Sequence, residues 1–289
     1  MIKPKLIIHG GAGQMEGSMF SFKDYHKALT KIIEKTYPVL IKENSRAAVI
    51  TGIRALETNP MFNAGKGSKL QRDGQVRMCA AIMSSDDNKF SGVINIRNVR
   101  HPISVADLLN KERHTVLGGN EATDFARQNE FKYFNPITEH RLKEFKEAMF
   151  GDTGTVGVVA LDAKGVMSVG TSTGGVGYER PGRIGDSATV AGTYASKYCG
   201  VSCTGKGEHI MNQAVAARVV TRVEDGKNLD SAVRKLIKES NDMGYHFGMI
   251  AVDYKGNVVV HGTKDVNVLY ATYDGDKIET FLSKDSEIK

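Results

Sequence analysis

Apolar positions recur along the chain with the period of an amphipathic helix in several stretches. The first covers residues 23–43, and the second covers about 45–58, where Ser45 is suited to be the N-cap. The pattern predicts further helices near residues 104–111, 119–129, 209–224 and 229–240. The apolar face of the first helix comprises Tyr25, Leu29, Ile32, Ile33, Val39 and Leu40.

Between these helices, short apolar runs bounded by turn residues predict β-strands, most of them paired as hairpins. Hairpins imply antiparallel sheets, and helix pairs between the hairpins imply helical outer layers. We therefore expect an α+β fold, a four-layer αββα sandwich with two antiparallel sheets inside. The predicted strands cover residues 5–9, 75–83, 90–96, 155–162, 166–171, 248–253 and 258–262.

Residues 130–151 follow neither pattern. They are charged and at best permissive for a helix, and they carry no apolar stripe that would bind a core. We interpret residues of about 130–154 as an exposed connector that ends at Phe150-Gly151-Asp152-Thr153-Gly154. The second half then begins abruptly with the apolar strand that starts at Thr155.

Length and composition favour one globular domain over residues 1–289. The 40% of apolar residues can fill a substantial core, but no stretch is long enough to span a membrane and the N-terminus is unlike a signal peptide. The net charge of +6 is spread along the chain among acidic residues, which favours a solvated surface over a nucleic-acid site. Cys79, Cys199 and Cys203 have no metal-like spacing and indicate reduced thiols, so we expect a cytoplasmic protein that binds neither nucleic acid nor membrane.

Candidate chemistry lies in the second half. Three glycine-rich clusters follow the strand that begins at Thr155, at residues 171–175, 181–186 and 203–208. Each has an ordinary interpretation: turn glycines, a surface ion pair between Arg183 and Asp186, or a helix N-cap at Ser202 or Thr204. Four such segments within 54 residues, 155 to 208, are harder to explain as turns alone.

A hairpin brings the end of its second strand beside the start of its first, so Thr173 is predicted to lie close to Thr155. A threonine hydroxyl is a poor nucleophile and needs a base. If the chain is cut before Thr155, the new α-amine has a reference pKa of about 7.7–8.0 and can serve as that base. This chemistry needs no metal or cofactor.

The motifs together resemble the plant-type L-asparaginase and isoaspartyl peptidase branch of the N-terminal-nucleophile hydrolases, nearly from end to end. They are HGGAG at 9–13, LETNPMFNAGKGSKL at 56–70, GTVGVVALD at 154–162, TSTGG at 171–175, GRIGDS at 182–187 and CTGKGE at 203–208. The resemblance implies the αββα sandwich of that class. It also implies self-cleavage between Gly154 and Thr155 into fragments 1–154 and 155–289.

The resemblance assigns the catalytic roles residue by residue. Thr155 would be the nucleophile, and Thr173 would support its hydroxyl and amine. Thr204 and Gly205 would form the oxyanion hole. The implied activity is hydrolysis of β-aspartyl dipeptides and of the side-chain amide of L-asparagine.

Substrate binding is assigned in the same way. Arg183 would bind the α-carboxylate and Asp186 the α-amino group of the substrate. Gly207 would line the pocket, and Asn63 would support the site.

The resemblance also implies a structural sodium ion and a homodimer of cleaved αβ units. The ion would be held by backbone carbonyls at Leu56, Glu57, Asn59, Phe62, Ala64 and Lys66.

The chain departs from the family pattern at two positions near the site, Cys79 and Lys206. Asp152-Thr153 also imitates the start of the glycosylasparaginase nucleophile strand. Thr155 is nevertheless favoured, because a branched apolar residue and a glycine follow it. Two alternatives stay open: a related amidohydrolase with a shifted substrate, such as a glycosylasparaginase, and an inactive, uncleaved relative that only binds a metabolite.

Overall fold

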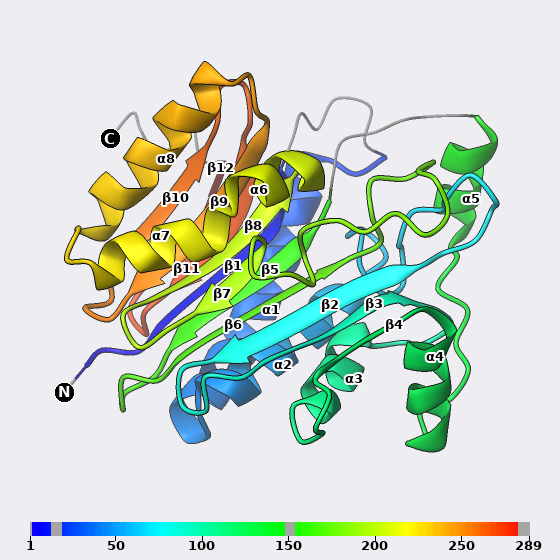
Figure 1. Ribbon diagram of the computed structural model, residues 1–289, viewed down its shortest axis with the longest axis horizontal. Coiled ribbons are helices and arrows are strands. Elements are labelled where there is room, and N and C mark those ends of the chain that lie inside the picture. The colour runs from blue at the N-terminus through cyan, green and yellow to red at the C-terminus, as the bar shows by residue number, and fades with distance from the viewer. Residues whose placement is uncertain (1, 13–18, 148–153, 283–289) are drawn as a thin grey trace.

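The computed structural model describes residues 2–12, 19–147 and 154–282, so Gly13 and the connector end at 150–153 lie outside the described residues. The elements stack in four layers, with helices outside and two β-sheets inside (Figure 1). This arrangement confirms the predicted α+β sandwich. Among the described helices, none is long and apolar enough to cross a membrane.

The larger sheet joins strands from both halves of the chain. Its strands are β1 (Lys5–Ala12), β2 (Met78–Ser84), β3 (Phe90–Ile96), β4 (Val116–Gly118), β5 (Val156–Leu161), β6 (Met167–Thr173), β11 (Val268–Tyr273) and β12 (Ile278–Leu282). Their spatial order is β12-β11-β1-β5-β6-β2-β3-β4. The described strand pairs are antiparallel except β3 with β4, so the prediction of purely antiparallel sheets is wrong at this edge. Every residue of β5 is buried, as expected for an interior strand that is covered on both faces.

Four helices pack against the outer face of the larger sheet (Figure 1). The N-cap of the second is Asn44, whose side chain accepts the Ala47 amide hydrogen at 2.8 Å. The prediction of Ser45 as the cap is therefore wrong, and the Ser45 hydroxyl instead bonds the Ser168 hydroxyl at 2.9 Å. The helices are α1 (Phe22–Lys42), α2 (Ser45–Thr58), α3 (Pro102–Leu109) and α4 (Gly119–Gln128).

The smaller sheet has the order β10-β9-β8-β7 and carries its own helical layer. The single helix predicted over 209–224 is interrupted at Ala214, where the left-handed backbone (φ 46, ψ 46) separates α6 from α7. The elements are β7 (Thr193–Ala195), β8 (Cys199–Gly205), β9 (Phe247–Asp253), β10 (Val258–Gly262), α6 (Gly207–Gln213), α7 (Val215–Glu224) and α8 (Leu229–Asp242).

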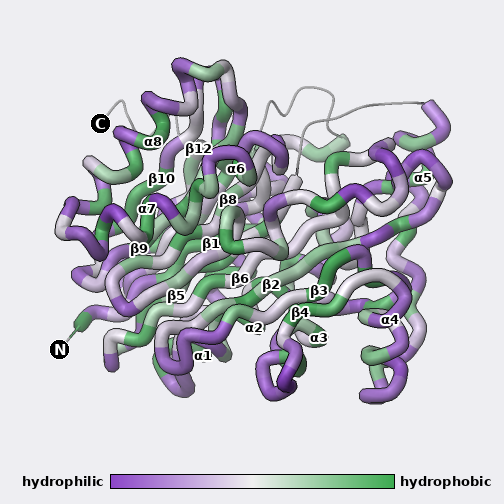
Figure 2. Tube along the Cα trace, in the orientation of Figure 1, coloured by the Kyte–Doolittle hydropathy of each residue, from purple (hydrophilic) through white to green (hydrophobic). Residues whose placement is uncertain are grey.

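The two sheets face each other across an apolar core, which Figure 2 shows as hydrophobic stretches along the inner strands. Val159 and Val169 of the larger sheet and Ile250 and Val252 of the smaller sheet belong to it. This packing fixes the start of β5 close to the end of β8, where the candidate catalytic residues lie.

The connector is less exposed than predicted. It contains a helix, α5 (Glu139–Lys146), and Phe131, Ile137 and Phe145 pack against the main core. The Arg141 guanidinium is buried and donates from Nε to the Gly67 carbonyl at 2.7 Å. These contacts tie the described part of the connector to the body of the protein.

Candidate active site

Thr155 immediately precedes β5 and is buried, with 5% of its surface exposed. Because Val156 pairs with Ser172 in the antiparallel register, Thr173 lies beside Thr155. The Thr155 hydroxyl donates to the Thr173 hydroxyl at 3.0 Å, and Thr173 Oγ1 also accepts the Gly175 amide hydrogen at 3.1 Å. The predicted proximity is confirmed, and the Thr173 oxygen is held where it can orient the Thr155 hydroxyl.

Asn63 contacts the residues that flank this hairpin, Gly154 before β5 and Gly174 and Gly175 after β6. Its side chain donates to the Gly175 carbonyl at 2.6 Å and accepts the Lys69 amide hydrogen at 2.9 Å. A Cβ atom on Gly154 would lie 2.9 Å from the Asn63 Cβ, and a Cβ on Gly174 would lie 2.6 Å from Asn63 Oδ1. The peptide before Thr155 can pass Asn63 because residue 154 has no side chain.

Thr204 and Gly205 end β8. The Thr204 hydroxyl is fully buried and has no hydrogen-bond partner among the described residues. Gly205 has φ +133, and a Cβ atom there would lie 2.5 Å from the Phe247 Cα. Only glycine suits this position, and the unpartnered Thr204 hydroxyl precedes it directly. Neither Ser202 nor Thr204 caps a helix, since the N-cap of α6 is Lys206.

The guanidinium of Arg183 contacts two carboxylates of the protein. Its Nε and Nη2 donate to the two oxygens of Glu208 at 2.7 Å each, and Nη1 donates to Glu179 at 3.1 Å. The predicted surface pair with Asp186 is thus replaced by a bidentate pair with Glu208. A guanidinium has five N–H donors, so one hydrogen on each terminal nitrogen stays available for a substrate.

Asp186 is almost fully buried, and its Oδ2 has no partner among the described residues. Burial raises the pKa of this carboxyl to about 7, while the Arg183 charge lowers it. A Cβ atom on Gly207 would lie 2.9 Å from both Asp186 Oδ1 and Arg183 Nη2. Gly207 therefore lies between the two predicted substrate-binding groups, and a buried carboxyl with one unpartnered oxygen suits a cationic ligand.

Three residues that sequence reasoning did not single out support Arg183. Glu208 and Glu179 hold its guanidinium, and Gln71 donates to Glu179 at 2.9 Å. Glu208 closes the CTGKGE motif, so its position after two glycines was an available signal. Glu179 and Gln71 lie outside the three glycine-rich clusters, so no signal in the sequence marked them.

The six predicted sodium-binding residues form the end of α2 and the following loop. Within it, the Leu56 carbonyl accepts the Asn59 amide hydrogen at 3.1 Å and the Glu57 carbonyl accepts that of Lys66 at 2.7 Å. The fully buried Glu57 carboxyl accepts the Ser172 hydroxyl at 2.7 Å, and burial raises its pKa. Ser172 precedes Thr173, so the loop is tied directly to the site.

The departures at Cys79 and Lys206 fall on two sides of the site. Cys79 pairs with Thr173 across β2 and β6, and burial raises its pKa to about 11, which keeps it a neutral thiol. Lys206 is exposed and directly follows Gly205. Cys199 and Cys203 are free and buried on β8, and burial raises the pKa of each thiol, so none of the three thiols is activated.

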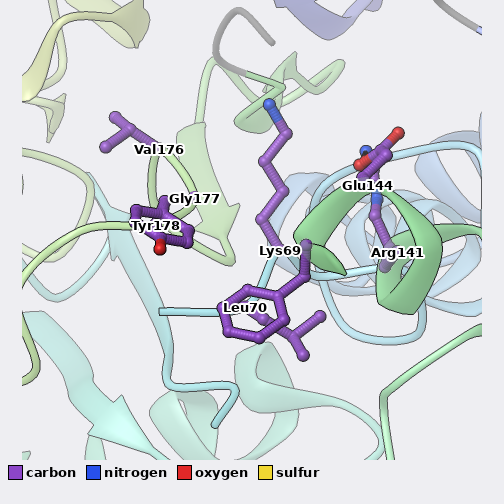
Figure 3. Close-up of a pocket in the computed structure, with 8 residues that line it drawn as sticks. Lys69, Leu70, Arg141, Glu144, Val176, Gly177 and Tyr178 are labelled. Carbon is purple, nitrogen blue, oxygen red and sulfur yellow. Dashed lines mark hydrogen bonds and ion pairs between the residues drawn. The ribbon is translucent and has the colours of Figure 1, made fainter. Parts of the chain in front are cut away.

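A small pocket lies beside the site, between α5 and the segment after β6 (Figure 3). In Figure 3, Lys69 extends between Tyr178 and the Arg141–Glu144 pair. None of the predicted catalytic or substrate-binding residues lines this pocket, which is formed by Lys69, Leu70, Arg141, Glu144, Phe145, Val176, Gly177 and Tyr178.

Known proteins are similar to this chain over nearly its whole length. The family model described as "Asparaginase" matches residues 2–153 and 148–282. The isoaspartyl peptidase/L-asparaginase of a Nostoc species is 41% identical over 96% of this chain and 94% of its own length. That of a Synechocystis species is 41% identical over 96% of this chain and 91% of its own length. The plant-type L-asparaginase of Pyrococcus horikoshii is 36% identical over 92% of this chain and 95% of its own length.

Proposed function

The chain belongs to the asparaginase family, and we propose that it hydrolyses the side-chain amide of L-asparagine and β-aspartyl dipeptides with Thr155 as its nucleophile. The observation that carries this proposal is the buried Thr155 hydroxyl, which donates to Thr173 Oγ1 at 3.0 Å. Both substrates present the reacting carbonyl one methylene away from an α-amino acid group, whose two charges Arg183 and Asp186 would bind.

The proposal includes self-cleavage between Gly154 and Thr155, which gives fragments 1–154 and 155–289. The Thr155 hydroxyl would attack the Gly154 carbonyl, the peptide would become an ester, and water would hydrolyse the ester. The close packing of Gly154 on Asn63 supports this step, since it holds the peptide against a rigid group. Mass spectrometry of aged protein should show the two fragments, and an intact chain with full amidase activity would exclude this route.

In the mature enzyme the Thr155 amine would take the hydroxyl proton as Oγ1 attacks the substrate amide carbon. The carbon–nitrogen bond then breaks, the amine returns the proton to the leaving group, and water hydrolyses the resulting ester. The unpaired Thr204 hydroxyl and the backbone at Gly205 would stabilise the oxyanion, a contribution of about 3–4 kcal/mol per donor in comparable sites.

Substrate recognition would use the two groups around Gly207. The remaining N–H groups of Arg183 would bind the α-carboxylate, and Asp186 would accept hydrogen bonds from the α-ammonium. A substrate panel on the matured enzyme tests this: L-asparagine, β-aspartyl dipeptides and a glycosylated asparagine. Preference for the glycosylated compound would support the glycosylasparaginase alternative, and a purified protein that stays uncleaved and inactive would support the binding-only alternative.

We also propose a structural sodium ion held by the carbonyls of Leu56, Glu57, Asn59, Phe62, Ala64 and Lys66. The residues fit a hard cation, because the loop offers a set of oxygen donors and each carbonyl has a second lone pair. The loop turns at Gly65 (φ +53), where a Cβ atom would lie 2.4 Å from the Glu57 carbonyl oxygen. Replacing sodium with a bulky organic cation should lower the thermal midpoint, and an unchanged midpoint would contradict the site.

Assembly and compartment are further proposals. From family resemblance we expect a homodimer of cleaved αβ units, which light scattering would contradict by showing a stable monomer. The three free, buried thiols agree with a reducing compartment such as the cytoplasm. Fractionation of the native cells tests that expectation.

A further inference from the structure

A chain of polar side chains crosses the apolar layer between the two sheets. His9 Nε2 lies 3.0 Å from the Ser202 hydroxyl, which lies 2.7 Å from the Thr171 hydroxyl. Thr171 in turn is 2.6 Å from the Thr193 hydroxyl, which donates to the Ser187 carbonyl at 2.8 Å. The chain alternates between sheets, from β1 to β8, then to β6 and β7.

All four side chains are completely buried. Burial lowers the pKa of His9 to about 3, so its ring is neutral, while a contact with the Thr155 backbone raises that pKa. His9 pairs with Gly157 across β1 and β5, which places it two residues along the strand from Thr155. His9 Nδ1 has no partner at standard hydrogen-bond geometry among the described residues, so the contact is a loose one.

The strand that carries Thr155 is shaped around this chain. A Cβ atom on Gly157 would lie 2.0 Å from the Ser202 hydroxyl and 2.2 Å from His9 Nε2. The hydrogen bond between His9 and Ser202 therefore occupies the space of the missing side chain. This contact gives a physical reason for glycine two residues after Thr155.

The hydrogens of the chain can be arranged in two directions. Each hydroxyl has one hydrogen, so Thr193 can donate either to the Ser187 carbonyl or to Thr171. In the first arrangement Thr193 donates to Ser187, Ser202 donates to Thr171, and His9 must supply the Nε2 hydrogen. In the second they donate toward His9, and the hydrogen is on Nδ1, facing Thr155. The His9 ring and the Ser187 carbonyl thus compete for the hydrogens of the hydroxyl groups between them.

We propose that His9, Ser202, Thr171 and Thr193 form a positioning relay that couples the orientation of Thr155 to the segment Asp186–Ser187. The relay rests on the proposed function, in which Thr155 is the nucleophile and Asp186 binds the substrate. Occupation of Asp186 would act on the adjacent Ser187 carbonyl and, through the hydroxyls, on the His9 ring beside Thr155. These residues do not touch substrate and are positioning residues.

Kinetics of matured variants test the relay. Ser202→Ala and Thr193→Val should each lower kcat/KM for L-asparagine about tenfold, as expected for one buried hydrogen bond. The double variant should lose no more than about tenfold, because either change already interrupts the chain. Thr193→Ser should restore most of the activity. Multiplicative losses of about a hundredfold in the double variant would overturn the relay.

Ser84→Ala is the matched control. It removes a buried hydroxyl in the larger sheet that bonds Ser168 at 2.7 Å, outside the relay. We expect a similar fall in thermal midpoint but kcat/KM within twofold of the unmodified protein. If Ser202→Ala and Thr193→Val give the same kinetic result as this control, they act on stability alone and the relay is wrong.

Nitrogen NMR of histidine-labelled protein separates this proposal from the proposed function. The chain has eight histidines, and the His9 ring should not titrate above about pH 4. Thr193→Val should change the His9 tautomer, although Thr193 does not touch the ring, whereas Ser84→Ala should not. This readout holds even if the protein neither cleaves itself nor hydrolyses amides. An unchanged His9 tautomer in Thr193→Val would overturn the relay.

Discussion

The Thr155 and Thr173 hydroxyls are 3.0 Å apart, although 18 residues separate them in the chain. The hairpin of β5 and β6 spans that separation and places the residue before β5 opposite the last residue of β6. The Thr173 oxygen is fixed in turn by the Gly175 amide, so the direction of the Thr155 hydroxyl is set by the backbone.

Replacement of Thr155 should separate its two proposed tasks. Thr155→Ala should abolish both self-cleavage and hydrolysis, because no nucleophile remains. Thr155→Ser keeps the hydroxyl but loses the methyl group that restrains its rotamer, so both steps should be slower by about tenfold. Thr155→Cys should still cleave, with lower turnover. Gel electrophoresis and ammonia release measure the two steps.

Thr153→Ala is the control for the position of the cut. Thr153 lies outside the described residues, and its replacement should leave both steps unchanged. If Thr153→Ala stays uncleaved while Thr155→Ala matures, the nucleophile is two residues earlier than proposed.

Gly154→Ala should slow cleavage without affecting the mature enzyme. The added Cβ atom would lie 2.9 Å from the Asn63 Cβ, so the peptide must shift. A shift that costs about 1 kcal/mol in the transition state slows cleavage about fivefold. Once cleaved, residue 154 ends the first fragment, and kcat/KM should equal that of the unmodified enzyme. Cleavage at the normal rate would show that the Asn63 contact does not orient the peptide.

Asp186→Asn should increase stability while it removes activity. The pKa of this buried carboxyl is about 7, above its ordinary 3.8, so the folded state holds the proton more tightly than the unfolded state. Its contribution to stability is therefore full below about pH 4 and is lost as the pH rises to about 7. The asparagine variant avoids that loss, which is on the order of a few kcal/mol.

The thermal midpoints of the two proteins should accordingly diverge between pH 4 and pH 7 and run parallel above pH 7. Hydrolysis of L-asparagine by the unmodified enzyme should fall as pH drops through the Asp186 pKa, because only the carboxylate binds an ammonium group. If the difference in thermal midpoint between the two proteins is the same at pH 4 and pH 8, the ionised Asp186 carboxyl does not destabilise the free protein.

Arg183→Lys tests whether the planar guanidinium of Arg183 is needed to bind the substrate carboxylate. Lysine keeps the charge but cannot bind Glu208 in bidentate fashion and also bind a substrate carboxylate. We expect kcat/KM to fall by at least about 30-fold, which corresponds to about 2 kcal/mol. Arg222→Lys is a matched control, since Arg222 also donates to a carboxylate, Glu239, at 2.7 Å but lies on α7 away from the site. Equal kinetic losses in both variants would indicate a general effect on stability.

The sequence predicted those parts of the fold that have strong local patterns. Helices at 23–43 and 45–58 and the hairpin from Thr155 were found because their apolar periods are long or their turns are marked by glycine. Strand β7 was missed, because three residues are too short for a period. The break at Ala214 was also missed, because no glycine or proline marks it.

Candidate site residues could be predicted only where they stand in glycine-rich motifs. The pairing of Arg183 with Glu208 depends on how α6 meets the loop after β6, which no local pattern encodes. The same is true of Ser202 and Thr193, which look like ordinary strand residues. Their role depends on the opposite sheet.

The strand order of the larger sheet determines how the two fragments of a cleaved chain stay associated. Strand β1, from the segment before Gly154, lies between β11 and β5, and β2 lies beside β6. The segments before and after the Gly154–Thr155 bond are therefore interleaved and share backbone hydrogen bonds at three strand junctions: β11 with β1, β1 with β5, and β6 with β2. A break in the backbone there leaves these junctions intact. Residues 1–154 and 155–289, produced as separate polypeptides, should accordingly reassemble by strand complementation, with a free amino terminus at Thr155 from the outset.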